Sequence, residues 1–425
     1  MKYARLPKVP DSIDKFRLIN GTIFDGFSDE PLERGEIEIQ DGRIAYVGKV
    51  RSNVHACDVR TIDIKGGYLT PGFIDLHVHM VMPNGIGSET IQWWFPEEEA
   101  FATAESLLLT LQAGVTAARD LSGLTPGYRN AIAQGLIEGP RMHLAISMLS
   151  PTGGHADPLA PNGALPVYAQ RATTPGWAVV DTQQETIKTV RRLNQMGADV
   201  IKVCTSGGLS TRFDSPDEIG ISRSQIALIS ELCGTLRSQP IAAHAQSTGG
   251  ISEAVYGGVS TIEHAYGLND ELIREILKRD ITLVPTLVTM HQEIKPEASN
   301  EYREMRMKRR EFGMSSMSKA IEAGVTIAVG TDSGITRHGD NLKELGYLVE
   351  AGMTPLQAIH AATYNGAKAM GLQHEIGTLE IGKCADMVLS QCDPMRSIRS
   401  FAEADSIRAV WQGGRCVKDL DHLAR

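Results

Sequence analysis

The chain has 425 residues, of which 42% are hydrophobic and 22% charged, and this composition excludes an extensively disordered protein. A formal net charge of −9 argues against nucleic acid or an anionic membrane as the main partner. The six cysteines form no Cys-x-x-Cys pair, and neither an apolar signal segment nor a bilayer-length apolar run is found. We therefore expect a cytoplasmic protein with reduced thiols, large enough for one barrel and a smaller domain.

Both ends of the chain are rich in short β-type segments. Residues 18–24, 35–40 and 43–48 have strand patterns, and Asp41-Gly42 between two alternating runs predicts a hairpin. Residues 377–389 and 407–417 repeat that style near the C-terminus. We therefore predict a small β-sandwich domain built from both termini, comprising residues 1–68 and 375–425.

The middle of the chain, residues 69–374, alternates apolar strands with amphipathic stretches such as 186–196 and 341–350. This pattern predicts an α/β domain, a (β/α)8 TIM barrel whose active site lies at the C-terminal ends of the strands. The eight predicted strands end near His79, Leu121, Ser147, Ser206, Gln246, Tyr266, Leu287 and Ser333. A Pro/Gly-rich interval over 150–179 interrupts the alternation, and a loop of that length is typically functional.

Four histidines occur at the ends of predicted strands. His77 and His79 are two residues apart, so they point to the same face of a strand and suit two ligands of one metal ion. His244 and His264 end the fifth and sixth strands at matching depth. A lone buried histidine is more often a hydrogen-bonded core residue, but a pair on successive parallel strands favours a shared site.

A lysine and an aspartate extend this ring of strand ends. Lys202 shares its strand face with Val200 and Cys204, so we expect it to point into the barrel, where burial lowers a lysine pKa. A neutral amine can add CO2 to form a carbamate that bridges two cations; a Schiff base is the alternative, but the histidines favour the metal site. Asp332 ends the last strand beside the first, where it can ligate a metal and accept a proton, or else cap a helix.

Together with its flanking segments, this set of strand-end residues resembles that of the amidohydrolase superfamily. The resemblance extends over essentially the entire chain. The similarity is carried by the run Pro71-Gly-Phe-Ile-Asp-Leu-His-Val-His79 and by residues 114–116, 352–359 and 377–389. Residues 150–157 and 201–208 resemble the imidazolonepropionase-related branch, which includes Xaa-Pro dipeptidases and hydrolases of N-acyl amino acids such as ochratoxin. The resemblance implies two metal ions, usually zinc, bridged by a carboxylated lysine, with ligands His77, His79, Lys202, His244, His264 and Asp332.

The remaining candidates concern the substrate. By resemblance His155, after Gly153-Gly154, contacts the scissile carbonyl oxygen; the alternative is a surface loop histidine. The run Trp93-Trp94-Phe95 predicts either an apolar pocket wall or a subunit interface of a homo-oligomer. Further candidates for substrate contact are His338, Tyr266 and Arg119, the last two for a carboxylate. Relatives commonly have His-Ala-His-Gly where this chain has His244-Ala-Gln-Ser, so the substrate contact there is altered.

The resulting hypothesis is a binuclear metal hydrolase that cleaves the C–N amide bond of dipeptides or N-acyl amino acids. A metal-bridging hydroxide attacks the carbonyl, and Asp332 carries the proton to the leaving nitrogen. The first alternative is an amidase for aryl amides, carbamates or ureas without a free carboxylate. A cyclic-amidine deaminase is a weaker alternative because mononuclear deaminases do not need Lys202. A non-catalytic scaffold would have lost ligands, whereas all six positions are filled here.

Overall fold

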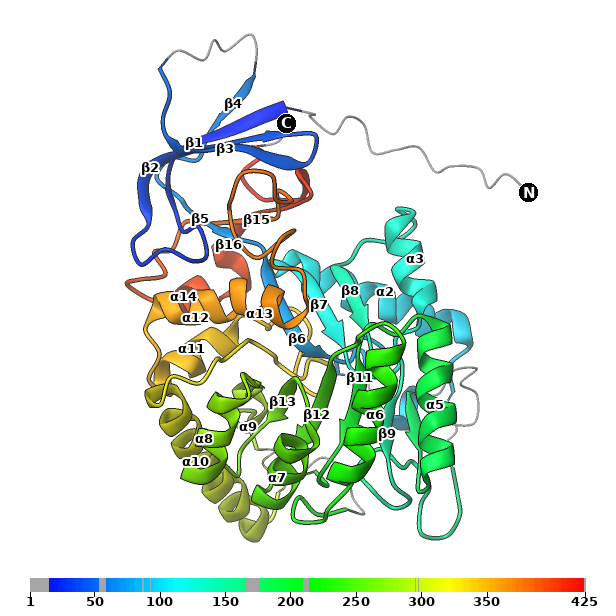
Figure 1. The fold of residues 1–425 in the computed structure, drawn as a ribbon. Helices are drawn as coiled ribbons and strands as arrows, with labels where there is room; N and C mark the ends of the chain where they lie inside the picture. The colour runs from blue at the N-terminus through cyan, green and yellow to red at the C-terminus, as the bar shows by residue number, and fades with distance from the viewer. Residues whose placement is uncertain are drawn as a thin grey trace, which may run out of the picture.

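The computed structural model describes residues 15–52, 59–85, 88–91, 93–165, 176–208, 214–294, 296 and 298–423. Figure 1 shows a mixed sheet with strands from both ends of the chain and a larger α/β part whose helices surround parallel strands. Among the described residues, no helix combines the length and the apolar character needed to cross a membrane.

The mixed sheet has eight strands in the order β17-β16-β15-β5-β1-β2-β3, with β4 beside β1. Their bounds are Lys15–Ile23 (β1), Leu32–Gln40 (β2), Arg43–Lys49 (β3), Arg60–Asp63 (β4), Tyr68–Pro71 (β5), Met387–Ser390 (β15), Ile407–Gln412 (β16) and Arg415–Asp419 (β17). Asp41 and Gly42, with φ of 51° and 76°, form the turn of the predicted hairpin. The pairing shows one sheet and does not show the two facing layers of the predicted sandwich.

The parallel strands form a three-stranded sheet, β6-β7-β8, and a six-stranded sheet, β10-β9-β11-β12-β13-β14. Their bounds are Phe73–Val78 (β6), Val115–Asp120 (β7), Arg141–Leu144 (β8), Met148–Ser150 (β9), Trp177–Val179 (β10), Ile201–Cys204 (β11), Ile241–Ala245 (β12), Thr261–His264 (β13) and Thr282–Val284 (β14). Because β5 leads directly into β6, the strand that ends at the two histidines starts beside the mixed sheet (Figure 1).

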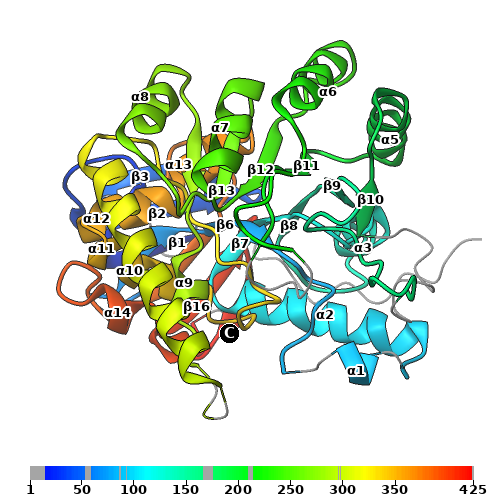
Figure 2. The same ribbon diagram turned by 90° about the horizontal axis from the view of Figure 1, so that it is seen from below.

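Helices cover the outside of the parallel strands, as Figure 2 shows from below. Their bounds are Ser88–Ile91 (α1), Pro96–Gln112 (α2), Pro126–Ala133 (α3), Gln183–Met196 (α5), Arg223–Thr235 (α6), Thr248–Gly257 (α7), Asp270–Lys278 (α8), Leu287–Met290 (α9), Asn300–Glu322 (α10), Lys343–Glu350 (α11), Pro355–Ala361 (α12), Tyr364–Ala369 (α13) and Ile398–Phe401 (α14). The helices predicted over 186–196 and 341–350 are present as α5 and α11.

Two of the eight predicted strands differ from expectation. The third is divided: β8 pairs with β7 and β9 with β11, and Ile146 between them has a positive φ of 69°. The eighth appears only as isolated bridges, from Ile327 to β14 and from Ser333 to β6. Segment 326–333 thus hydrogen-bonds to both parallel sheets, yet the paired strands do not form one closed eight-stranded ladder.

Candidate functional site

Two imidazoles and a carboxylate meet where β6 ends. His77 and His79 are 2% and 6% exposed, and their Nε2 atoms lie 3.4 and 3.1 Å from Asp332 Oδ1. The backbone amide of Asp332 donates to the carbonyl of His77 at 2.7 Å, which fixes the aspartate beside this strand. The two histidines therefore share one face of β6, as their spacing predicts.

The second histidine pair lies against the first. The ring centroids of His244 and His264 are 4.6 Å apart, and those of His77 and His264 are 5.0 Å apart. Nitrogen atoms of His77 and His264 and an oxygen of Asp332 all lie within 4.8 Å of one another. The structure thus gathers side chains from β6, β12, β13 and the segment after β14 into one buried cluster.

His244 and His264 do not lie at the same level along their strands, contrary to the prediction. In the parallel register His244 stands opposite Glu263, and His264 stands opposite Ala245, one residue further along. By strand alternation His264 would face away from Glu263, but its φ of 71° turns the backbone, so both consecutive side chains reach the interior. Glu263 therefore also lies inside the cluster. The sequence analysis did not predict this residue.

Each of the four imidazoles has one ring nitrogen held by a protein group. The pairs are His77 Nδ1 with Glu263 Oε2 at 3.0 Å, His79 Nδ1 with Ser122 Oγ at 2.9 Å, His264 Nδ1 with Thr286 Oγ1 at 2.7 Å and His244 Nε2 with the Gly207 carbonyl at 3.1 Å. Such partners orient an imidazole, and the two that only accept, the Glu263 carboxylate and the Gly207 carbonyl, also fix which nitrogen can ligate a metal. None of these partners was found by sequence reasoning, because each comes from a different strand end.

The pKa shifts of three imidazoles and of the carboxylate suit metal binding, whereas that of His79 opposes it: burial alone would lower the pKa of His79, but its hydrogen bond to Asp332 raises it. Burial lowers the pKa of His77 and brings that of His264 to about 3, and the charge of Lys202 acts in the same direction on both. Burial alone would raise the pKa of Asp332, but the adjacent His77 and His79 lower it well below its usual range. Neutral imidazoles and an ionised carboxylate are the forms that bind a divalent cation.

Lys202 lies inside the same cluster, on β11. It is 1% exposed, and its Nζ makes no hydrogen bond within the part of the chain that the structure describes. Burial lowers the pKa of this amine, although the charge of Glu263 opposes the shift. A buried amine without a hydrogen-bond partner is rare, because the free-energy cost of removing it from water is not compensated. The contacts within the protein therefore do not explain why a lysine lies at this position.

His155 reaches the cluster from the loop after β9. Its ring stacks on His244 with centroids 3.9 Å apart and planes 19° apart. Its Nδ1 lies 3.0 Å from Asp214 Oδ2, which also accepts the backbone N–H of Gly208 at 2.7 Å. The structure therefore brings His155 beside the histidines, and Asp214 is a second orienting residue that sequence reasoning missed.

Arg119 does not fit the predicted contact with a substrate carboxylate. It is 1% exposed, and it donates to the Leu76 carbonyl at 2.7 Å, to Thr261 Oγ1 at 3.2 Å and to Glu263 Oε1 at 2.7 Å. Because its donors are directed to protein acceptors inside the parallel strands, the guanidinium is a buried structural cation here. That prediction is corrected on the ground of its burial and its partners.

Tyr266 and His338 are also buried beside the cluster. The Tyr266 hydroxyl lies 3.0 Å from Thr286 Oγ1 and 2.9 Å from Thr289 Oγ1, so it supports the group that holds His264. His338 Nε2 lies 2.9 Å from the Met82 carbonyl, and burial lowers the pKa of this histidine to about 4. Substrate contact by either residue stays a prediction.

The aromatic run before α2 is on the surface. Trp93 and Phe95 are 78% and 72% exposed, and Trp94 is half-buried. Walls of an apolar pocket bury such rings, so the structure does not show this run as a pocket lining. The alternative of a subunit interface stays a prediction.

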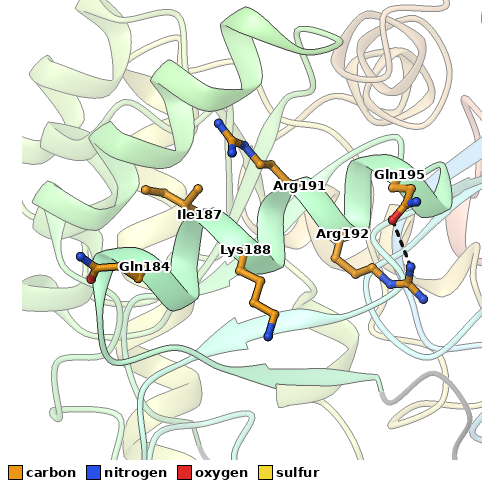
Figure 3. Close-up of a pocket in the computed structure, with 6 residues that line it drawn as sticks. All are labelled: Gln184, Ile187, Lys188, Arg191, Arg192 and Gln195. Atoms are coloured by element: carbon orange, nitrogen blue, oxygen red, sulfur yellow. Dashed lines mark hydrogen bonds between the residues drawn. The ribbon is translucent and has the colours of Figure 1, made fainter.

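Two surface hollows lie away from the histidines. One of about 790 Å³ runs along α5 and is lined by residues of that helix only, as Figure 3 shows; the lining comprises Gln184, Ile187, Lys188, Arg191, Arg192 and Gln195. The other, of about 310 Å³, lies between α10, α12 and α13. Neither hollow is lined by a residue of the cluster. The candidate site is therefore identified by its titratable side chains and not by a cavity.

Comparisons with known proteins identify the family. An ochratoxinase of Aspergillus niger is 30% identical over 438 residues, covering 98% of this chain and 90% of that protein. An imidazolonepropionase of Geobacillus sp. is 25% identical over 385 residues, covering 84% of each. The solved structure of a prolidase complexed with N-methylphosphonate-L-proline has a TM-score of 0.87 at 27% identity, covering 95% of this chain and 100% of that one.

These relatives confirm the predicted resemblance, and structural neighbours of this kind show a fold of the TIM-barrel type. A model of the amidohydrolase family matches residues 68–417, which is most of the chain. The chain therefore belongs to the amidohydrolase family and is a hydrolase acting on C–N bonds.

Proposed function

We propose that this chain is a binuclear, metal-dependent hydrolase that cleaves the amide bond of dipeptides or N-acyl amino acids. The observation that carries the proposal is the buried amine of Lys202, which has no hydrogen-bond partner among the described residues although four imidazoles surround it. A carbamate on this amine would supply the two anionic oxygens that a pair of cations requires, and would account for the missing partner.

The donor set fits two divalent cations. His77, His79 and Asp332 would hold one ion, His244 and His264 would hold the other, and the carboxylated Lys202 would lie between them. We propose zinc, because imidazole and carboxylate ligands with little exposure to water suit it. When bound, such ions supply an activated water and polarise the scissile carbonyl.

The chain's own residues supply proton transfer and orientation. Asp332 Oδ1, held near two imidazoles, would accept a proton from the attacking water and deliver it to the leaving nitrogen, so that the C–N bond breaks with a neutral amine leaving. His155, stacked on His244 and oriented by Asp214 at Nδ1, would with both ring nitrogens protonated donate a hydrogen bond from Nε2 to the carbonyl oxygen as negative charge develops on it.

The substrate class is supported by two relatives named for such bonds, the ochratoxinase and the prolidase. The free carboxylate of a dipeptide or N-acyl amino acid must find a polar partner on entering the site, because an unpaired buried anion is costly. Since Arg119 is already engaged, that partner has to be another group at the mouth of the site. We also propose that residues 69–374 form the catalytic domain and that 1–68 with 375–425 form the smaller one.

The test is a substrate panel combined with metal analysis. Xaa-Pro and Xaa-Phe dipeptides and N-aroyl amino acids should be hydrolysed, and their C-terminal carboxamides should show kcat/KM lower by about a hundredfold. Protein purified without chelator should contain two metal equivalents. Equal cleavage of amides and simple anilides would refute the substrate class in favour of an aryl amidase, and one equivalent of metal would refute the binuclear site.

A further inference from the structure

A buried ion pair lies directly behind one histidine of the cluster. Glu263 is fully buried, and its Oε1 accepts hydrogen bonds from Arg119 at 2.7 Å and from the Thr261 hydroxyl at 2.6 Å. Its other oxygen, Oε2, lies 3.0 Å from His77 Nδ1. Arg119 is itself fixed by the carbonyl of Leu76, on the same strand as His77.

This arrangement determines where the proton of His77 lies. An ionised carboxylate only accepts hydrogen bonds, so the contact with Oε2 requires a proton on His77 Nδ1. The other nitrogen, Nε2, then keeps its lone pair and faces Asp332 and the interior of the cluster. Two donors bind Oε1 and His77 binds Oε2, so these contacts keep the carboxylate from rotating. They therefore also keep the proton of His77 on Nδ1.

His77 differs from the other three imidazoles in the charge of its partner. Their held nitrogens face neutral groups, namely the hydroxyls of Ser122 and Thr286 and the carbonyl of Gly207. A hydroxyl can donate or accept and so tolerates either tautomer, whereas the Gly207 carbonyl and the Glu263 carboxylate only accept, and each requires a proton on the ring nitrogen that it contacts. A carboxylate partner also makes the ligating nitrogen more basic.

We propose that Arg119 and Glu263 are a positioning pair that sets the tautomer and orientation of His77 for metal binding. The inference rests on the metal site proposed above and adds two residues that do not touch the metal or the substrate. A buried ion pair contributes little net stability, because the loss of hydration offsets the attraction between the charges. The pair is therefore better explained by the histidine that it orients.

The decisive variant is Glu263→Gln. Arg119 and Thr261 donate on one side, so the oxygen of the new amide must face them and its NH2 must face His77 Nδ1. That donor forces Nδ1 to accept, which moves the proton to Nε2 and removes the lone pair from the metal position. We expect zinc affinity, measured by competition with a chromophoric chelator, to fall by about ten- to a hundredfold.

A double variant separates positioning from damage to the fold. In Arg119→Met with Glu263→Gln the amide is free to turn: its oxygen can accept from His77 Nδ1 while its NH2 donates to the Thr261 hydroxyl. Zinc affinity should then recover most of the loss seen in Glu263→Gln. Arg141→Met is the matched control, since it removes the arginine partner of another buried carboxylate, that of Asp386, with which no imidazole of the described residues forms a hydrogen bond; wild-type affinity is expected.

The tautomer of His77 can be measured in the metal-free protein. Ring ¹⁵N chemical shifts of His77 in the chelated wild-type protein, assigned with His77→Gln, should show a protonated Nδ1, and Glu263→Gln should show a protonated Nε2. Wild-type zinc affinity in Glu263→Gln, or a protonated Nε2 in the wild type, would overturn the positioning role. Failure of the wild type to bind zinc would instead refute the proposed function, and the ¹⁵N shifts would still decide the inference.

Discussion

Replacing Lys202 by methionine should stabilise the metal-free protein while removing its activity. The lysine is 1% exposed and its amine has no hydrogen bond among the described residues, so folding removes this group from water without compensation. Leaving a buried polar group unsatisfied costs about 1–3 kcal/mol even when it is neutral. Methionine fills similar volume without that penalty, and a volume-conserving replacement costs less than about 1.5 kcal/mol in repacking.

The net expectation for Lys202→Met is therefore a gain of about 1 kcal/mol in the free energy of unfolding, measured by denaturant titration in the presence of a chelator. With zinc present the order should reverse, because metal binding stabilises only the wild type. Lys383→Met is the matched control, since that amine contacts Thr378 and Glu380 and its loss brings no gain. A Lys202→Met protein that is less stable than wild type under chelation, or that retains two metal ions and activity, would refute the reasoning.

Three further variants test other parts of the site. Asp332→Asn should keep its fold but lose about a hundredfold or more in kcat, because an amide cannot accept the proton; full activity would transfer this role to another group. Burial raises the pKa of Glu344 to about 8, so Glu344→Gln should lower the free energy of unfolding by about 1–3 kcal/mol above that pH and by less at neutral pH. The ionised carboxylate accepts the backbone N–H groups of Leu287 and Val288, both at 2.7 Å, and an amide satisfies only one; the exposed Glu350→Gln is its control. Burial lowers the pKa of His338 to about 4, so the unfolded chain binds the proton first, and this histidine should contribute about 3 kcal/mol to the loss of stability on acidification from pH 6.5 to about 4. His338→Gln should remove that contribution and leave those of the other buried histidines, whereas the exposed His422→Gln should leave the whole dependence in place.

The parts of the site that follow from local periodicity could be predicted from the sequence. His77 and His79 share a face because they are two residues apart, and Asp332 lies beside them because the segment after β14 hydrogen-bonds to β6. Both inferences need only the strand period and the order of parallel strands. The same reasoning predicted the hairpin at Asp41-Gly42 and the helices that became α5 and α11.

The partners of buried polar side chains could not be predicted in this way. Arg119 was expected to bind a substrate carboxylate, but its carboxylate partner is Glu263, which lies 144 residues further along the chain. A sequence shows that a strand carries an arginine but not which acceptors surround it after folding. Tyr266 illustrates the same limit, because its hydroxyl lies against Thr286 and Thr289 from the neighbouring strand end.

Backbone conformation at the strand ends accounts for the remaining differences between the predicted and the observed site. His264, Thr286 and Asp332 have φ of 71°, 51° and 56°, in a region that non-glycine residues rarely adopt. Each such residue costs about 1–3 kcal/mol and persists only where surrounding contacts over-determine it. Here Thr286 binds His264 and the next two amides bind Glu344. Strand alternation therefore fails at the strand ends, where consecutive residues such as Glu263 and His264 both turn inward to build the cluster.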